Sequence, residues 1–264
     1  MNDTIGNGGV GSLQYVFTPE SQLPADVGFS LFGPSHLLVL FLIGLLSAVV
    51  IFPGCQMRPE NRQRLLKVMS ASMIALEVLK DLTLGAMGVF SLGYLPLHLC
   101  SMAMFLCLFF AWHPDSPAAG ELVWGVCFSG GLAALLFPDW TNMPLYHFQS
   151  IHSFLYHALL IQFSLIAVIS GMARPRLRHL WRTMVFLVLA AAVVYPLNLL
   201  LRTNYMFLNH PLSGTPLILC TRLPGRAGYL LGYALLAVLV LALLDLPFAL
   251  ISGLKRHLKA KGNM

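Results

Sequence analysis

Seven long apolar segments constrain the fold of this chain more than any other feature of its sequence. A helix needs about 20 apolar residues to cross the hydrocarbon core of a bilayer, because each residue advances it by about 1.5 Å. The segments are residues 35–52, 66–90, 95–112, 122–137, 154–171, 183–201 and 228–251. Apolar residues form 58% of the chain and charged residues 10%, whereas a typical soluble protein has about 25% charged residues. The sequence therefore predicts an all-α fold, a polytopic membrane bundle of seven transmembrane helices.

The polar stretches between these segments are too short to fold alone, so we expect a single membrane domain over residues 35–254. An extracytoplasmic tail, residues 1–34, precedes this domain, and a basic cytoplasmic tail, residues 255–264, follows it. Residues 1–26 contain no Lys or Arg and lack the basic start and apolar centre of a cleaved signal peptide. The first helix is therefore expected to insert the protein.

Basic residues predict the orientation, because Lys and Arg concentrate on the cytoplasmic side of membrane proteins. Four of them follow each of the first, fifth and seventh segments, while only Arg202, Arg222 and Arg226 lie on the opposite side. This bias places the N-terminus outside and the C-terminus in the cytoplasm. The net charge of +6 then reflects topology and attraction to anionic lipid heads, and nucleic acid is not expected as a partner.

Polar residues gather at one depth of the predicted bundle. Cys100, His157 and Asp81 lie five, seven and nine residues from the expected outer ends of their segments. The same outer half contains His36, His98, Asn198 and Asn204. Polar groups inside a membrane are costly and usually retained for function, so this clustering predicts an outward-facing site.

Residues 95–100, Leu-Pro-Leu-His-Leu-Cys, place a histidine two positions from a thiol. Pro96 suits the first turn of a helix, which would put Cys100 one turn further along. His98 and Cys100 would then lie about 200° apart around the helix and point to different faces. His157 could face Cys100 from another helix, and a histidine can hold a thiol as its nucleophilic thiolate. Cys100 is left with two interpretations, a reactive thiol or a small apolar side chain of the helix. His98 is left with two interpretations, a catalytic group or a hydrogen-bonding partner of a neighbouring helix or lipid head.

Glu77, Lys80 and Asp81 form a charge cluster in the second segment. Glu77 and Asp81 are four residues apart and share a helix face, where like charges repel unless one is protonated or both bind a cation. Two interpretations remain open. Lys80 neutralises the pair and fixes helix packing, or a carboxylate orients a histidine or forms part of a proton path.

The other cysteines and two of the histidines are not expected to take part in chemistry. They are Cys55, Cys107, Cys127, Cys220, His147 and His152, the two histidines being expected in solvated loops. Their spacing matches neither a disulfide framework nor a zinc pattern. The sequence therefore predicts no resident metal and no other cofactor.

Five motifs follow one another from the second to the sixth segment. They are the acidic stretch around Glu77, residues 95–100, Phe137-Pro138-Asp139, Phe154-Leu155-Tyr156-His157, and Asn198 with Thr203-Asn204-Tyr205-Met206-Phe207-Leu208. Together they resemble the YwaF-like bacterial integral membrane proteins and their eukaryotic relatives. Those relatives include the transmembrane cysteine acyltransferase that makes polyunsaturated ether phospholipids.

This resemblance implies an intramembrane acyltransferase of seven helices in a bacterial inner (plasma) membrane. Cys100 would carry the acyl group as a thioester and His157 would be the base, with phospholipids and lysophospholipids as partners. Supporting or substrate-binding roles would fall to His98, Asn204, Asn198, Glu77, Asp81 and His36. Asn204, Asn198 or His98 could donate hydrogen bonds to the oxyanion of the reaction.

Three alternatives to this function stay open. A more distant similarity to the androgen-induced membrane hydrolases, which use a Thr and a His, allows a lipid hydrolase. A transporter or channel could use the buried Glu77, Asp81 and histidines, although no inverted repeat is visible. A metal site could be built from His98, Cys100 and His157.

Overall fold

The computed structural model describes residues 12–262, with side chains described for residues 14–250. All regular secondary structure in this part of the chain is helical, and it contains no strand. The α-helices are α1 (Pro34–Gln56), α2 (Pro59–Ala86), α3 (Leu99–Trp112), α4 (Pro117–Leu122), α5 (Ser129–Leu136), α6 (Phe148–Ile169), α7 (Leu180–Leu201) and α8 (Gly225–Gly262). Short 3-10 turns are η1 (Ser12–Tyr15), η2 (Glu20–Gln22), η3 (Leu92–Tyr94), η5 (Leu177–His179), η6 (Tyr205–Phe207) and η7 (Pro216–Arg222). A π-helical segment, η4 (Val123–Phe128), joins α4 to α5.

Six helical segments within the described residues are long and apolar enough to cross a bilayer. They are Pro34–Gln56, Leu92–Trp112, Pro117–Leu136, Phe148–Ile169, Leu177–Leu201 and Gly225–Leu250. The predicted second span forms α2, but α2 carries seven charged residues along its 28. The all-α, multi-pass membrane protein is therefore confirmed, and the count of spans supported by length and composition is six.

Helix α6 begins at Phe148, six residues earlier than the predicted segment. His147 precedes it, and its Nδ1 accepts a hydrogen bond from the backbone N–H of Gln149 at 3.2 Å, which satisfies a free donor of the first turn. The Nε2 of the same ring donates to the Thr18 carbonyl at 2.9 Å. Burial lowers the pKa of His147, so the imidazole stays neutral and one nitrogen remains an acceptor. The expectation of a solvated loop histidine was wrong here.

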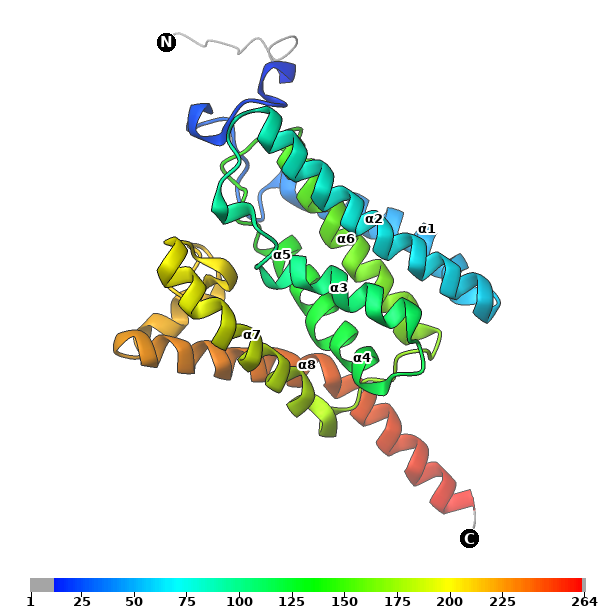
Figure 1. The fold of residues 1–264 in the computed structure, drawn as a ribbon. Helices are drawn as coiled ribbons and strands as arrows, with labels where there is room; N and C mark the ends of the chain where they lie inside the picture. Colours follow the sequence, from blue (N-terminus) through cyan, green and yellow to red (C-terminus); the bar gives the residue numbers. More distant parts are fainter. Residues whose placement is uncertain (1–11, 263–264) are drawn as a thin grey trace, which may run out of the picture.

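The helices form a main bundle with a separate pair beside it. In the most apolar stretches of α6 and of the α4–α5 span 56% of the residues are buried, against 11% in α1, α7 and α8. The two former helices are thus central, and Figure 1 shows α7 and α8 together on one side of the bundle. A Cβ atom at Gly125 would lie 2.4 Å from the Thr183 hydroxyl, so α7 reaches η4 only because this residue is glycine.

The chain before α1 folds over the loop between α5 and α6. Phe148 donates its backbone N–H to the Val16 carbonyl at 3.0 Å, and Phe29 donates to the Thr141 carbonyl at 2.9 Å. At the other end α8 stays helical to Gly262, through most of the segment predicted as a basic tail. The predicted N-terminal tail therefore packs on a loop of the bundle, and the predicted C-terminal tail continues the last helix.

Candidate active site

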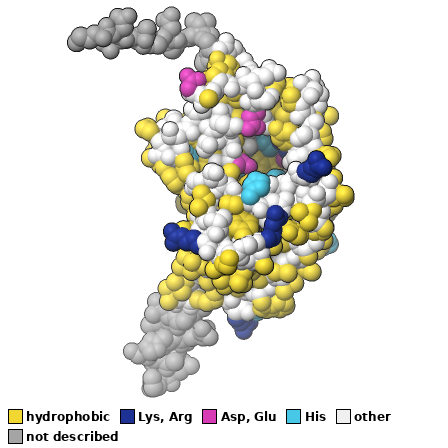
Figure 2. Space-filling model, turned by 90° about the vertical axis from the view of Figure 1, so that its left-hand side faces the viewer, with side chains coloured by type: hydrophobic (Ala, Val, Ile, Leu, Met, Phe, Trp, Pro, Cys, Tyr) yellow, Lys and Arg dark blue, Asp and Glu magenta, His cyan; other side chains and the backbone are white. Residues whose placement is uncertain are grey.

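A cavity of about 950 Å³ lies between the main bundle and the α7–α8 pair. Its long apolar walls include Leu136, Leu187, Leu230 and Val240. The residues with polar or titratable side chains that line it are Glu20, Glu77, Lys80, Tyr94, His98, Cys100, Ser101, Ser129, Asp139, Gln149, His152, Ser153, Tyr156, His157, Thr215 and Tyr233. Figure 2 shows acidic and histidine side chains inside a hollow bordered by hydrophobic ones. An apolar space with a few convergent polar groups suits an amphipathic ligand.

Cys100 is the second residue of α3 and lines this cavity. The helix begins at Leu99, because Leu97 turns back to bond the Leu95 carbonyl at 2.7 Å and His98 is extended at φ −71° and ψ 149°. The prediction that Pro96 starts the helix was therefore wrong. The first backbone N–H groups of a helix have no partner within it, and its positive end favours negative charge. A thiolate or an oxyanion would gain from this position.

His157 lines the same cavity from α6 and is nine-tenths buried. Its Nδ1 lies 2.6 Å from the Ser153 carbonyl oxygen. Because a carbonyl only accepts, Nδ1 must carry the proton, and Nε2 of the neutral ring is left as the basic nitrogen. Nε2 has no hydrogen-bond partner among the residues that the structure describes, and no hydrogen bond there joins the ring to the Cys100 thiol. His157 is thus held in the tautomer that can take up a proton.

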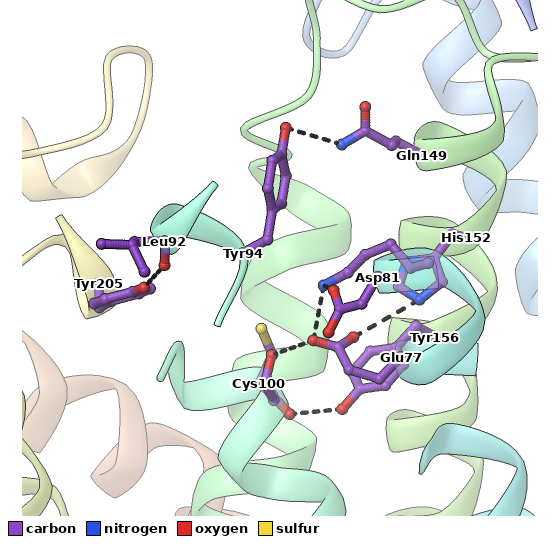
Figure 3. Close-up of polar contacts among 11 residues, drawn as sticks. Glu77, Asp81, Leu92, Tyr94, Cys100, Gln149, His152, Tyr156 and Tyr205 are labelled. Atoms are coloured by element: carbon purple, nitrogen blue, oxygen red, sulfur yellow. Dashed lines mark hydrogen bonds and ion pairs between the residues drawn. The ribbon is translucent and has the colours of Figure 1, made fainter. Parts of the chain in front are cut away.

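Glu77 joins several side chains at the level of Cys100 (Figure 3). Its Oε1 accepts hydrogen bonds from Lys80 Nζ at 2.8 Å and from the Ser101 hydroxyl at 3.1 Å. Lys80 also lies 3.3 Å from Asp81, while His152 Nε2 lies 3.8 Å from the other oxygen of Glu77. Both interpretations of the charge cluster therefore have support, because Lys80 pairs with the two carboxylates and Glu77 faces a histidine.

The histidine beside Glu77 was not expected from the sequence. His152 was predicted in a solvated loop, but the early start of α6 places it inside that helix, where its ring stacks on Tyr156 at 5.6 Å. The signal that could have revealed it is the spacing of His152 and Tyr156, which are four residues apart on one helix face.

His98 contacts the segment that follows α7. Its Nδ1 accepts a hydrogen bond from the backbone N–H of Met206 at 3.4 Å, and its ring packs edge-to-face on Tyr205 at 5.2 Å. Met206 and Phe207 both have positive φ, 55° and 54°, an uncommon conformation that the surrounding packing must hold in place. Of the two interpretations of His98, the hydrogen bond to a neighbouring segment is the one observed.

Asn198 and Asn204 hold this segment in shape and do not border the cavity. Asn198 is fully buried, accepts from the Tyr205 N–H at 2.8 Å and the Thr203 hydroxyl at 2.9 Å, and donates to the Tyr205 carbonyl at 2.9 Å. Asn204 donates to the His210 carbonyl at 3.0 Å. Their amide groups are used in these local bonds, so the structure does not support the oxyanion role expected for them.

His36 is also a structural residue and does not border the cavity. It is fully buried, its Nδ1 accepts from the Phe32 N–H at 3.1 Å, and its Nε2 donates to the Leu135 carbonyl at 3.0 Å. Nδ1 therefore holds the residues just before α1, and Nε2 joins the start of α1 to the end of α5.

A match to a protein family covers most of the chain, residues 31–245. The chain belongs to the TMEM164 family. Searches of curated proteins and of solved structures found no significant match. The matched region of this TMEM164-family protein contains the whole cavity lining except Glu20. The match confirms that the chain belongs to a family of membrane proteins, and the YwaF-like relationship stays a prediction.

Three further residues of the TMEM164-family protein border the cavity and were not predicted as site residues. Tyr156 precedes His157, Trp140 stacks on it, and Asp139 belongs to the Phe-Pro-Asp motif. Burial raises the pKa of the Asp139 carboxyl. Within the described residues no group of three His, Cys, Asp or Glu side chains is arranged to hold a metal ion, so His98, Cys100 and His157 do not assemble into one ligand set.

Proposed function

We propose that this TMEM164-family protein is an intramembrane acyltransferase that moves a fatty-acyl group between phospholipid and lysophospholipid. The observation that carries the proposal is a thiol at a helix start and a histidine with a free Nε2 on the wall of one largely apolar cavity. The apolar length of the cavity suits an acyl chain. Its polar group of side chains suits the ester region of a phospholipid, which lies near the headgroup boundary.

The chemistry needs two matched half-reactions. His157 Nε2 takes the Cys100 thiol proton, the sulfur attacks the ester carbonyl carbon, and the C–O bond to the glycerol breaks. The leaving alkoxide takes the proton from His157, which releases a lysophospholipid and leaves a thioester. A second lysophospholipid hydroxyl then reverses these steps. The free Nε2 of His157 is the atom available to receive this proton.

The oxyanion of each half-reaction would lie at the start of α3. The backbone N–H groups of Cys100 and Ser101 lack partners within the helix, as the first turn of any helix does. Fixed donors of this kind are worth about 10²–10³ in rate in other acyl-transfer enzymes. This assignment replaces the asparagine donors expected from the sequence.

Two alternatives are outcomes of the same tests. Water entering the cavity would hydrolyse the thioester and make the protein a lipid hydrolase. Transport through the cluster is less well supported, because Lys80 lies within 3.3 Å of both Glu77 and Asp81 and already provides them with a cationic partner.

We infer further that α2 is a seventh span and that the N-terminus lies outside. The 28 residues of α2 extend about 42 Å, which is long enough to cross a bilayer. In Figure 1, α2 lies beside α1 and α6. The orientation is supported by the Lys and Arg residues that follow the first, fifth and seventh predicted segments, because these residues concentrate on the cytoplasmic side. Membership of the YwaF-like bacterial group, and with it a bacterial inner membrane, stays a prediction from the motifs around Cys100 and His157.

The test is direct detection of the intermediate. Purified protein incubated with phospholipid should gain a fatty-acyl mass on the peptide that contains Cys100, and neutral hydroxylamine should remove it. Cys100→Ala should abolish both the adduct and acyl exchange, whereas Cys107→Ala, at a fully buried core position, should retain them. A folded Cys100→Ala protein that still exchanges acyl chains between phospholipid and lysophospholipid would refute the covalent mechanism.

A further inference from the structure

Tyr156 connects the two helices that carry the proposed nucleophile and base. Its side chain is 2% exposed, and its hydroxyl donates a hydrogen bond to the backbone carbonyl of Cys100 at 3.0 Å (Figure 3). Tyr156 directly precedes His157 in α6. One hydrogen bond therefore joins the helical turn that carries the base to the helical turn that carries the thiol.

A second contact holds the same turn of α3 from another direction. Ser101, the residue after Cys100, donates its hydroxyl to Glu77 of α2 at 3.1 Å. Lys80 holds Glu77 in turn at 2.8 Å. The first turn of α3 is thus tied to α6 through Cys100 and to α2 through Ser101.

This turn needs such support because the chain before it is not helical. Residues 95–98 form a tight turn and an extended N-cap, and helix ends fray more readily than helix centres. In a low-dielectric interior a buried hydroxyl–carbonyl bond is strengthened, since water does not compete for it. A displacement of about 1 Å between reacting groups can lower a rate by about 100-fold.

We propose that Tyr156 is a positioning residue, which sets the relative placement of Cys100 and His157 through its hydroxyl, and that Ser101 assists it through Glu77. This inference rests on the proposed function of Cys100 as the nucleophile. The Tyr156 and Ser101 hydroxyls hold the catalytic turn through a carbonyl and a carboxylate, while the Ser101 backbone N–H is the group proposed to meet the oxyanion. Their effect should therefore fall on kcat and on thiol reactivity, with little change in KM.

Tyr156→Phe removes the hydroxyl but keeps the ring that stacks on His152. It should lower kcat for acyl exchange by about 10- to 100-fold and slow alkylation of Cys100 by iodoacetamide between pH 6 and 9. Ser101→Ala should act in the same direction, and Ser101→Thr, which retains the hydroxyl, should recover most of the loss.

Tyr229→Phe is the matched control. It removes a tyrosine hydroxyl that donates to a backbone carbonyl, that of Phe207 at 2.6 Å, but Tyr229 does not border the cavity. Its melting temperature should fall about as much as that of Tyr156→Phe, while Cys100 alkylation stays at the wild-type rate.

Alkylation is followed by mass spectrometry of the Cys100 peptide, so it reports on position whether or not acyl transfer occurs. Equal alkylation rates in wild type, Tyr156→Phe and Ser101→Ala would overturn the positioning role. If Tyr156→Phe does not fold, Ser101→Ala and Ser101→Thr decide the question. Slowed alkylation in a protein that never gains an acyl thioester would keep the positioning role and refute the acyltransferase.

Discussion

The indole ring of Trp140 lies nearly parallel to the imidazole of His157, with ring centroids 5.5 Å apart and an angle of 14° between the planes. Trp140 comes from the loop between α5 and α6, and Phe154 packs edge-on against it at 5.3 Å. The stack holds the His157 ring by its face, while the Ser153 carbonyl holds it by Nδ1. The proposed base is therefore restrained in both position and rotation.

Trp140→Ala should both destabilise the protein and lower its turnover. Removing a buried aromatic side chain costs about 3–5 kcal/mol in protein cores. Without the stacked ring the His157 imidazole can move, so kcat should fall by about 10-fold or more. Trp140→Phe keeps an aromatic face against His157 and should retain most of the activity. Thermal melting and acyl exchange measured on both variants check this. Wild-type turnover in a folded Trp140→Ala protein would contradict a role for the stack.

Asp139→Asn should stabilise the protein at neutral pH. Burial, with a smaller contribution from the Glu20 carboxylate, raises the pKa of Asp139 above its ordinary value of 3.8. The folded state then binds this proton more tightly than the unfolded state. The contribution of Asp139 to the free energy of unfolding is therefore fully present below about pH 3.8 and is lost as pH rises through the pKa of the folded state. The variant should melt higher than wild type at pH 7 and equally near pH 4.

The control for this pH dependence is Asp26→Asn, which changes an exposed carboxyl outside the spans. It should leave the melting temperature unchanged at both pH values. A melting difference for Asp139→Asn that stays constant from pH 4 to pH 7 would contradict the raised pKa.

Asn198→Ala should lower stability by about 2–4 kcal/mol, because it leaves the Tyr205 backbone groups buried without their side-chain partner. Asn204→Ala, whose hydrogen bonds are largely exposed, should cost less. The melting temperature and the kcat of the folded protein are measured for both variants. A structural role lowers the melting temperature, whereas a catalytic role lowers kcat. A fall in kcat at an unchanged melting temperature would restore Asn198 as an oxyanion donor.

Labelling of single cysteines checks the orientation. Asn142 and Arg176 are exposed positions at opposite ends of α6, and the bias of Lys and Arg predicts that only the first faces outward. An impermeant maleimide added to intact cells should label a cysteine at 142 and not one at 176. The reverse pattern would invert the topology.

The sequence by itself determined the helical membrane fold and the two residues proposed for catalysis. Span length and apolarity are properties of a local stretch of chain, so six of the seven predicted segments match helices long and apolar enough to cross a bilayer. Cys100 and His157 stood out because polar groups are costly in a membrane. Their common cavity agrees with the depth estimated by counting residues along each segment.

Only the tertiary structure decided which polar groups meet. His152 faces Glu77, Tyr156 bonds the Cys100 carbonyl, and Asn198 is used entirely by Tyr205 and Thr203. These pairs join residues on different helices or across a sharp turn, and their geometry depends on how each helix is rotated and where it begins. Because α3 begins at Leu99 and His98 is extended, the helical angle expected between His98 and Cys100 does not apply. The rotation of each helix about its axis cannot be predicted from local sequence, because packing between distant segments sets it.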